Sequence, residues 1–363
     1  MPTRLSLTLL LSSIFLVGQQ VNSQTPSSQP KPEQQFTDLG DFKLQSGATI
    51  HDLRLGYRTL GKLNAGKSNV ILWPTWLGAR SEDLLPFIGP GSVVDTNKYF
   101  VILIDSIGNG VSSSPSNSTV QPLIKFPKFT IRDMVESEHQ LATKIFQLSH
   151  LHAVMGLSMG GMQAFEWAVV FPEFMDLAIP MNGSPQSTSS DKLLWTSEID
   201  AIELDPAWNN GNPKGPLTRG IAIAAEIGEM NATSPTYVTT HTLDFDTFLT
   251  SLRKSSTSDA GSAWDQIRQR EAILALDIPS EFHVPFEQVA KRVRSKMLVI
   301  VSTQDHVVNP DPAIRFANAI VAPVIYLDSP CGHRSLSCIS VGPTVAQFLA
   351  NPSSVHTQTL REP

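Results

Sequence analysis

A serine whose hydroxyl could attack a carbonyl carbon lies in the segment Gly156-Leu-Ser158-Met-Gly160. The apolar run 152–155 before it predicts a buried strand, and the spacing of apolar residues over 159–170 predicts a helix. A Gly-x-Ser-x-Gly segment between a strand and a helix is typical of a sharp turn that strains the serine backbone and exposes its hydroxyl. The short pattern alone can arise by chance, so the prediction depends on the strand and the helix that flank it. We therefore predict that Ser158 is the nucleophile of an acyl-transfer reaction.

The residues that would activate this serine are expected further along the chain. A serine hydroxyl needs a base to remove its proton, and the base needs a carboxylate that orients it and stabilises its positive charge. Asp305 and His333 each follow a predicted strand, in the order serine, acid, histidine in which such triads occur. We predict that Asp305 orients His333 and that His333 is the base. Asp328, which ends the strand before His333, is the alternative acid.

Acyl transfer also needs backbone N–H groups that point at the oxyanion forming on the substrate. We expect one of them from Met159, directly after the nucleophile. The other should come from the loop after the predicted strand 69–73, which reads Pro74-Thr-Trp76-Leu-Gly78. Proline has no N–H, and we choose Trp76 as the second donor. Its ring would serve equally well as a wall of the cleft.

The chain has two cysteines, Cys331 and Cys338, and they flank His333 closely. In an oxidising compartment an even count favours a disulfide, and a bridge here would fix the loop that carries the histidine. Two separate small buried side chains are the alternative, because spacing alone does not establish disulfide geometry. No cysteine and histidine cluster has zinc-site spacing, and no glycine-rich phosphate loop or dinucleotide-binding segment follows a predicted strand. We therefore predict no metal site and no cofactor.

The elements that must position these groups alternate between strands and helices. Short apolar, β-branched runs bounded by turn residues predict buried strands of a largely parallel sheet. Segments with helical spacing lie between some of them, and this alternation predicts an α/β fold. The predicted strands are 69–73, 99–105, 152–155, 177–182, 296–301 and 322–328, and the predicted helices are 131–148, 159–170 and 312–321.

Residues 183–291 break this alternation with several helical stretches and scattered aromatic residues. Helices inserted at the carboxyl ends of a parallel sheet usually form a cap that shapes the substrate cleft. We predict an α/β core in two parts, 36–182 and 292–350, with 183–291 as a helical cap. Residues 351–363 are left as a tail.

The N-terminal residues predict where the protein acts. A single Arg4, an apolar run over 5–18 and the small residue Ser23 predict a secretory signal peptide, 1–23, and a secreted or periplasmic protein. A buried N-terminal helix is the alternative. Residues 24–35 are mostly Gln, Ser, Pro and Lys, which predicts a flexible linker. The mature chain has no further apolar run long enough to span a membrane.

The charge of the chain argues against two classes of partner. Its 27 Lys and Arg residues against 33 Asp and Glu residues give a formal charge of −6. This balance predicts no basic surface for nucleic acid or an anionic membrane. A composition of 41% hydrophobic and 17% charged residues over 363 residues is typical of a globular protein. The predicted acyl-transfer serine makes a small-molecule ester or acyl substrate the expected partner.

Several motifs carry a likeness to a known family. They are Ile88-Gly-Pro-Gly91, Asp95-Thr-Asn-Lys-Tyr-Phe100, Thr130-Ile-Arg-Asp-Met-Val135, Gly156 to Trp167, and Asp205-Pro-Ala-Trp208. On these residues the chain resembles the homoserine O-acetyltransferase family of α/β-hydrolases, over nearly all of 36–349. The resemblance implies the α/β-hydrolase fold, with a deep cleft beneath the cap and a homodimer formed through the cap. It also implies an acyl intermediate on Ser158, with Asp305 and His333 completing the triad.

Two positions depart from the transferases of this family. The resemblance implies an aspartate directly after the catalytic histidine, which meets the substrate amino group, and a cap arginine, which meets the substrate carboxylate. Here these substrate-binding positions hold Arg334 and Glu226. Arg334 would repel an ammonium group, so we expect that homoserine is not the acceptor. We predict that Glu226 and Arg334 pair across the cleft and close the amino-acid site.

Three functions remain open at this point. Water is the acceptor always present outside the cell, so an exported hydrolase of a carboxylic ester is the favoured prediction. An O-acyltransferase with another acceptor is the nearest alternative, because the same triad serves both reactions. A non-catalytic binding protein on a hydrolase scaffold is the third, because fold does not fix function.

Overall fold

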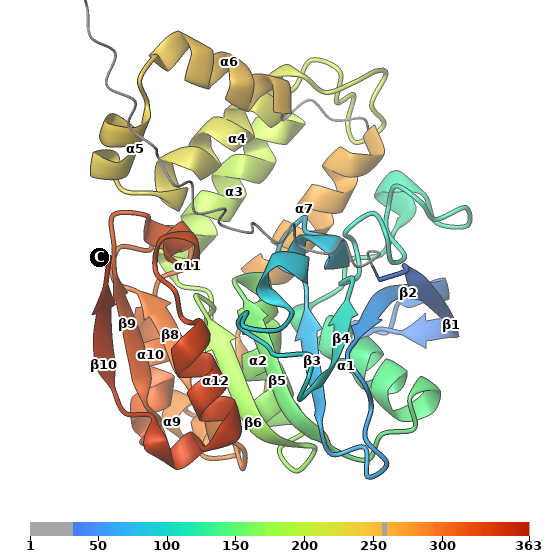
Figure 1. Cartoon of the computed structure of the whole chain (residues 1–363). Helices are drawn as coiled ribbons and strands as arrows, with labels where there is room; N and C mark the ends of the chain where they lie inside the picture. The colour runs from blue at the N-terminus through green and yellow to red at the C-terminus, as the bar shows by residue number, and fades with distance from the viewer. Residues whose placement is uncertain (1–31, 256–259, 363) are drawn as a thin grey trace, which may run out of the picture. The chain divides into compact units, whose positions relative to one another are not determined.

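A ten-stranded sheet forms the centre of the protein (Figure 1). The computed structural model describes residues 32–255 and 260–362. The strand order is β1-β2-β4-β3-β5-β6-β8-β9-β10, with the short β7 beside β6. β2 runs antiparallel to β1 and to β4, and the other pairings in this part of the chain are parallel, which confirms the predicted mostly parallel sheet. The strands are β1 Gln35–Lys43, β2 Thr49–Leu60, β3 Val70–Pro74, β4 Phe100–Ile104, β5 Leu151–Leu157, β6 Met175–Met181, β7 Lys296–Met297, β8 Val299–Ser302, β9 Val324–Asp328 and β10 Gln358–Arg361.

The inner parallel strands are buried on both faces, which explains why their sequences are almost continuously apolar. Every residue of β3 is buried. Because side chains alternate across a strand, Leu72 packs into one apolar core and Ile71 into the other. The first core also holds side chains of α1 Ile131–Gln140, α2 Met159–Val170 and α10 Asp311–Ala319, and the second holds those of α12 Gly342–Ala350.

The chain between β6 and β7 is helical, where the sequence predicts an insertion over 183–291 (Figure 1). α3 packs against both α4 and α7. A separate apolar cluster joins these helices, in which the rings of Trp208 and Trp264 lie 4.8 Å apart. α4 also contacts the short helix that follows β9, so this group of helices reaches the carboxyl end of the sheet. The helices are α3 Ser189–Glu203, α4 Arg219–Ala232, α5 Pro235–His241, α6 Phe245–Ser255, α7 Ala260–Leu274, α8 Ile278–Glu281 and α9 Phe286–Ala290.

Short helical segments complete the described structure. They are η1 Ser81–Phe87, η2 Leu123–Lys125, η3 Leu141–Ile145, η4 Gly332–Arg334, α11 Ser335–Cys338 and η5 Pro352–Ser354. η3 is a π-helical turn that ends the helix predicted over 131–148 early. None of the described helices combines the length and the apolar character that crossing a membrane requires.

The structure differs from the predicted boundaries at both ends of the core. β1 begins at Gln35, and Gln34 Nε2 donates to Asp105 Oδ2 at 2.9 Å, so the predicted linker is wrong at its last residues. The predicted tail, 351–363, carries β10, which pairs in parallel with β9. Both are polar edge segments whose conformation comes from pairing with the sheet rather than from an apolar pattern. The predicted signal peptide, 1–23, lies outside the described residues.

Glu138 of α1 is a carboxyl group buried between two helices. Its Oε2 accepts a hydrogen bond from Trp167 Nε1 of α2 at 2.7 Å, and its Oε1 has no hydrogen-bond partner in the described part of the chain. Burial raises the pKa of Glu138 to about 8, although the hydrogen bond from Trp167 opposes the shift. The folded protein therefore holds a proton here that the unfolded chain releases near pH 4.5.

This buried acid predicts that the stability of the protein falls as pH rises. Between pH 4.5 and about 8 the folded state binds a proton that the unfolded state has lost, so the contribution is complete below this window and lost above it. Glu138→Gln keeps an acceptor for Trp167 without a charge and should flatten the decline. Each tenfold difference in proton affinity between the folded and unfolded states corresponds to about 1.4 kcal/mol in the free energy of unfolding. Urea unfolding of both proteins at about pH 5, 7 and 9 tests this, and equal pH slopes would contradict it.

Candidate active site

Ser158 lies at the turn between β5 and α2. Its φ of 57° and ψ of −121° are values that a residue other than glycine rarely adopts. The glycines on either side let the strand and the helix approach closely. A Cβ on Gly156 would lie 2.1 Å from Gly160 O, and a Cβ on Gly160 would lie 2.6 Å from Pro74 O. The predicted strand, sharp turn and helix are thus all present around the serine.

His333 lies between Ser158 and Asp305. Its Nε2 is 2.9 Å from Ser158 Oγ, and its Nδ1 is 2.6 Å from Asp305 Oδ2. A neutral imidazole that donates Nδ1–H to the carboxylate presents Nε2 as an acceptor for the serine O–H. Asp305 Oδ1 accepts the backbone N–H groups of Val307 and Val308 at 2.9 Å each, and the side chain is 1% exposed. The structure therefore brings together the three residues that the sequence selects, with the carboxylate fixed through both oxygens.

Asp328, the alternative acid, is not the partner of the imidazole. Both ring nitrogens of His333 are already engaged, by Ser158 and by Asp305. The Asp328 carboxylate accepts instead from Arg361 Nε of β10 at 3.0 Å. The sequence does not decide between the two acids, because each is preceded by a predicted strand. The contacts of the folded chain decide, since Asp305 bonds to His333 and Asp328 bonds to Arg361.

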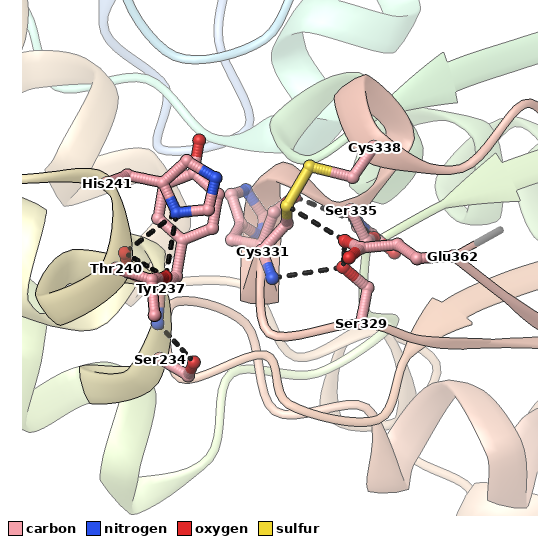
Figure 2. The surroundings of a disulfide bond; sticks show 11 residues. Ser234, Tyr237, Thr240, His241, Ser329, Cys331, Ser335, Cys338 and Glu362 are labelled. Atoms are coloured by element: carbon pink, nitrogen blue, oxygen red, sulfur yellow. Dashed lines mark hydrogen bonds between the residues drawn. A yellow bond between two sulfur atoms is a disulfide. The ribbon is translucent and has the colours of Figure 1, made fainter.

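The loop that carries His333 is held at several points. A disulfide joins Cys331 to Cys338, so the bridge that the sequence leaves open is present (Figure 2). Figure 2 shows Ser329 and Glu362 beside the bridge; Ser329 Oγ accepts the Cys331 N–H at 3.0 Å. Glu362 Oε1 lies 3.2 Å from Cys331 Sγ. Cys331, Cys338 and Glu362 could form a metal site only in the reduced protein, because the disulfide leaves no thiolate ligand.

Asn182 is a second support of this loop, and the sequence analysis does not single it out. Its Nδ2 donates to His333 O at 2.9 Å and to Ser335 Oγ at 3.2 Å. Asn182 directly follows β6, next to the strands that carry the nucleophile and the acid. Its position after a parallel strand is the one signal that could have pointed to it.

Two backbone N–H groups are candidates for binding an oxyanion. The N–H groups of Trp76 and Met159 have no protein acceptor within residues 32–255 and 260–362. The N–H of Thr75 is occupied, since it donates to Ile104 O at 3.0 Å. The close approach of Gly160 to Pro74 O brings the loop after β3 to the start of α2. Trp76 and Met159 therefore remain the candidate donors.

Arg334 and Glu226 do not pair with each other, and the predicted ion pair is wrong. Arg334 Nη1 and Nη2 lie 2.9 and 2.6 Å from the two carboxylate oxygens of Glu229. Glu226 Oε1 accepts from Arg253 Nε at 2.6 Å, beside a cavity of about 580 Å³ that no triad residue lines. Glu229 follows Glu226 by one turn of α4, and the sequence cannot choose between two acids on one helix. The side chain that the sequence misses is therefore Glu229.

A cavity of about 880 Å³ adjoins the loop that carries Trp76. Trp76 and Phe87 form part of its apolar wall, and Asn109 and Arg270 are among its polar residues. Arg270 is neutralised by Glu198, with Nε and Oε2 2.6 Å apart. No triad residue lines this cavity, but it adjoins the loop of the candidate oxyanion donor and is large enough for part of a small-molecule substrate.

Comparison with known proteins agrees with this geometry. Residues 69–335 match the family described as alpha/beta hydrolase fold. The chain belongs to the alpha/beta hydrolase fold family. This α/β-hydrolase is 38% identical to a probable esterase of Corynebacterium glutamicum over 176 residues, which are 48% of the chain and 50% of the relative. It is 34% identical to the ethyl acetate hydrolase of Pseudomonas veronii over 212 residues, 57% of the chain and 60% of the relative.

Transferases are also among the relatives of this α/β-hydrolase. It is 37% identical to the homoserine O-acetyltransferase of Methanohalophilus mahii over 210 residues, 52% of the chain and 43% of the relative. The alignments thus span 43% to 60% of the length of these three curated relatives.

Solved structures extend the likeness to most of the chain. An acetyl esterase matches 89% of this chain and 95% of its own, with a TM-score of 0.79 and 26% identity. The homoserine O-acetyltransferase of Bacillus anthracis matches 87% of this chain and 97% of its own, with a TM-score of 0.77 and 25% identity. The resemblance that the sequence predicts, to the homoserine O-acetyltransferase branch of the α/β-hydrolases, is confirmed.

Proposed function

We propose that this α/β-hydrolase hydrolyses a carboxylic ester through an acyl intermediate on Ser158. The observation that carries the proposal is the pair of contacts of His333, 2.9 Å to Ser158 Oγ and 2.6 Å to Asp305 Oδ2. This arrangement of nucleophile, base and acid is the one that activates a serine hydroxyl for attack on a carbonyl carbon. The esterases among its relatives and structural neighbours support the same reaction.

In the proposed reaction, Ser158 Oγ attacks the ester carbonyl carbon while His333 Nε2 takes its proton. Asp305 keeps the ring in the right tautomer and stabilises the imidazolium, and the N–H groups of Trp76 and Met159 bind the oxyanion. The ester C–O bond then breaks, and His333 gives its proton to the departing alcohol. A water molecule that loses its proton to the same nitrogen then attacks the acyl-serine. The bond from the acyl carbon to Ser158 Oγ breaks, His333 returns the proton to Oγ, and the carboxylic acid leaves.

Transfer of the acyl group to a second alcohol is the alternative, and the homoserine O-acetyltransferases among the relatives favour it. Both reactions share the acyl-serine, and the outcome depends on whether the closed cleft excludes water. The test is product analysis with an activated acetate ester, with and without added alcohols and CoA thioesters. We expect free acid as the main product under all conditions. A new ester in excess over free acid would instead establish transfer.

We further propose that the protein acts outside the cytoplasm. A disulfide persists best in an oxidising compartment, and the chain uses both of its cysteines in one. The composition of residues 1–23 also supports export. Expression of the full chain, cell fractionation and N-terminal sequencing test this. A mature N-terminus directly after Ser23 is expected, and full-length protein retained in the cytoplasm would contradict the proposal.

The ion pair of Arg334 predicts a preference for uncharged esters. Arg334 directly follows His333, and Glu229 neutralises it through two contacts. Glu229→Gln leaves the guanidinium without its carboxylate, so a negatively charged ester should gain relative to a neutral one. We expect the ratio of kcat/KM for a hemisuccinate ester to that for the butyrate ester of the same alcohol to rise about three- to fivefold, the size of an exposed charge pair.

Glu226→Gln is the matched control for this prediction. It makes the same change of charge one turn earlier on α4, where the partner is Arg253. The ratio of the two esters should stay at the wild-type value in this variant. The effect of Glu229→Gln should also shrink as salt is added, because exposed charges are screened. An equal rise in both variants would mean that net charge, and not Arg334, sets the preference.

A further inference from the structure

The segment between the two cysteines carries the base of the proposed triad on very little regular structure. It consists of η4 and α11, of three and four residues. Helices this short are not stable by themselves, and the hydrogen bonds from Arg334 N to Cys331 O and from Ile339 N to Ser335 O are among the few they have. The disulfide ties Cys331, directly before η4, to Cys338, the last residue of α11, with the Cα atoms 6.6 Å apart.

The two ends of the segment differ in how firmly they are held. Cys331 is 1% exposed, and its N–H donates to Ser329 Oγ. Next to it, a Cβ on Gly332 would lie 2.9 Å from Ala232 O, so this end is packed against the last residue of α4. Cys338, at the other end, is only partly buried. The bridge therefore ties the less buried end of the segment to its well-buried end.

The hydrogen bonds of His333 do not by themselves hold every part of the segment that carries it. Asn182 holds the carbonyl group of His333, and Asp305 holds Nδ1. The Asn182 amide also donates to Ser335 Oγ, at the first residue of α11, so these contacts hold the start of this helix and not its end at Cys338. Without the bridge, the end of α11 at Cys338 could move away from Cys331 and displace the segment that carries the imidazole. A displacement of about 1 Å at a reacting group costs up to about 100-fold in rate.

We propose that the Cys331–Cys338 disulfide positions His333, and that its reduction by a dithiol reversibly lowers the rate of acyl transfer. The inference rests on the proposed function. In the reduction, a thiolate of the dithiol attacks the sulfur of Cys338, the less buried cysteine, and Cys331 leaves as a thiolate that takes up a proton. The second thiol of the reagent then displaces Cys338. The reagent ends as a cyclic disulfide, and two electrons and two protons pass to the cysteines.

The test reduces the full-length wild-type protein with increasing dithiothreitol and measures kcat and KM for an activated acetate ester. Iodoacetamide trapping and intact mass count the free thiols, and the count reports this bond alone because the chain has two cysteines. We expect kcat to fall at least about tenfold as both thiols appear, with KM within about twofold and full recovery on reoxidation. Unchanged kcat with both thiols trapped would overturn the inference.

A second measurement separates positioning from simple loss of folded protein. Titration with a fluorophosphonate gives both the number of reactive serines and the rate at which each reacts. Positioning predicts that the reduced protein still labels to completion, but more slowly. Incomplete labelling at the oxidised rate would mean partial unfolding and would overturn the inference. The variant Cys331→Ser/Cys338→Ser should match the reduced protein and should not respond to dithiothreitol.

The oxidised protein separates this inference from the function on which it rests. If the oxidised wild type neither labels nor hydrolyses any ester, the proposed function fails. If it hydrolyses esters and the reduced protein does so equally fast, only the role of the disulfide fails.

Discussion

Ser158→Ala should lower kcat for ester hydrolysis by about 10⁴- to 10⁶-fold, the range seen when the nucleophile of such a triad is removed. The hydroxyl that is lost is the one that His333 Nε2 reaches at 2.9 Å. The remaining oxyanion donors would leave a small residual rate. Hydrolysis of a chromogenic ester and intact mass after fluorophosphonate treatment measure the effect. One adduct is expected on the wild type and none on the variant.

Ser302→Ala is the matched control for this loss. Ser302 ends β8 and is fully buried, and its Oγ has no hydrogen-bond partner among the described residues. The same substitution there removes a buried hydroxyl without touching the imidazole, so labelling and kcat should stay within about twofold of the wild type. An adduct that persists on Ser158→Ala would rule out this serine as the nucleophile. Failure of the folded wild type to label at all would favour a binding protein on a hydrolase scaffold.

The candidate triad could be predicted from the sequence because its geometry follows from strand order. Ser158, Asp305 and His333 follow β5, β8 and β9, which lie near one another in the parallel part of the sheet. The carboxyl ends of parallel strands lie at the same edge of a sheet, so the loops that follow them can be predicted to lie close together from the strand pattern alone. The apolar runs that mark these strands are strong signals, since the strands are buried on both faces.

Features at the rim of the fold were less predictable. β10 and the contact of Gln34 with Asp105 depend on pairing with a sheet that exists only in the folded state. The choice of Glu229 over Glu226 as the partner of Arg334 depends on the rotation of α4 about its axis. A rotation of this kind is set by packing between helices, and the sequence of one helix does not contain it.

The last prediction concerns the acid of the triad. Asp305→Asn should lower kcat by about 10⁴-fold, the loss typical of a triad with its histidine in the wrong tautomer. Asp305 Oδ1 accepts two backbone N–H groups, so the amide oxygen of the variant keeps that place. The amide NH₂ group then faces His333 Nδ1, which must become an acceptor. Nε2 therefore carries the proton and can no longer take the one from Ser158.

Asp328→Asn provides the matched comparison, because it makes the same change at the other acid that follows a strand. Asp328 bonds to Arg361 and not to the imidazole, so kcat should stay within about twofold of the wild type. Measurement of kcat for both variants across pH gives the decisive contrast. The Asp305→Asn variant should recover activity at alkaline pH, where hydroxide replaces the lost base, while Asp328→Asn follows the wild-type profile. A larger loss in Asp328→Asn would mean that the imidazole takes its support from that carboxylate during the reaction, and the proposed roles of the two acids would have to be exchanged.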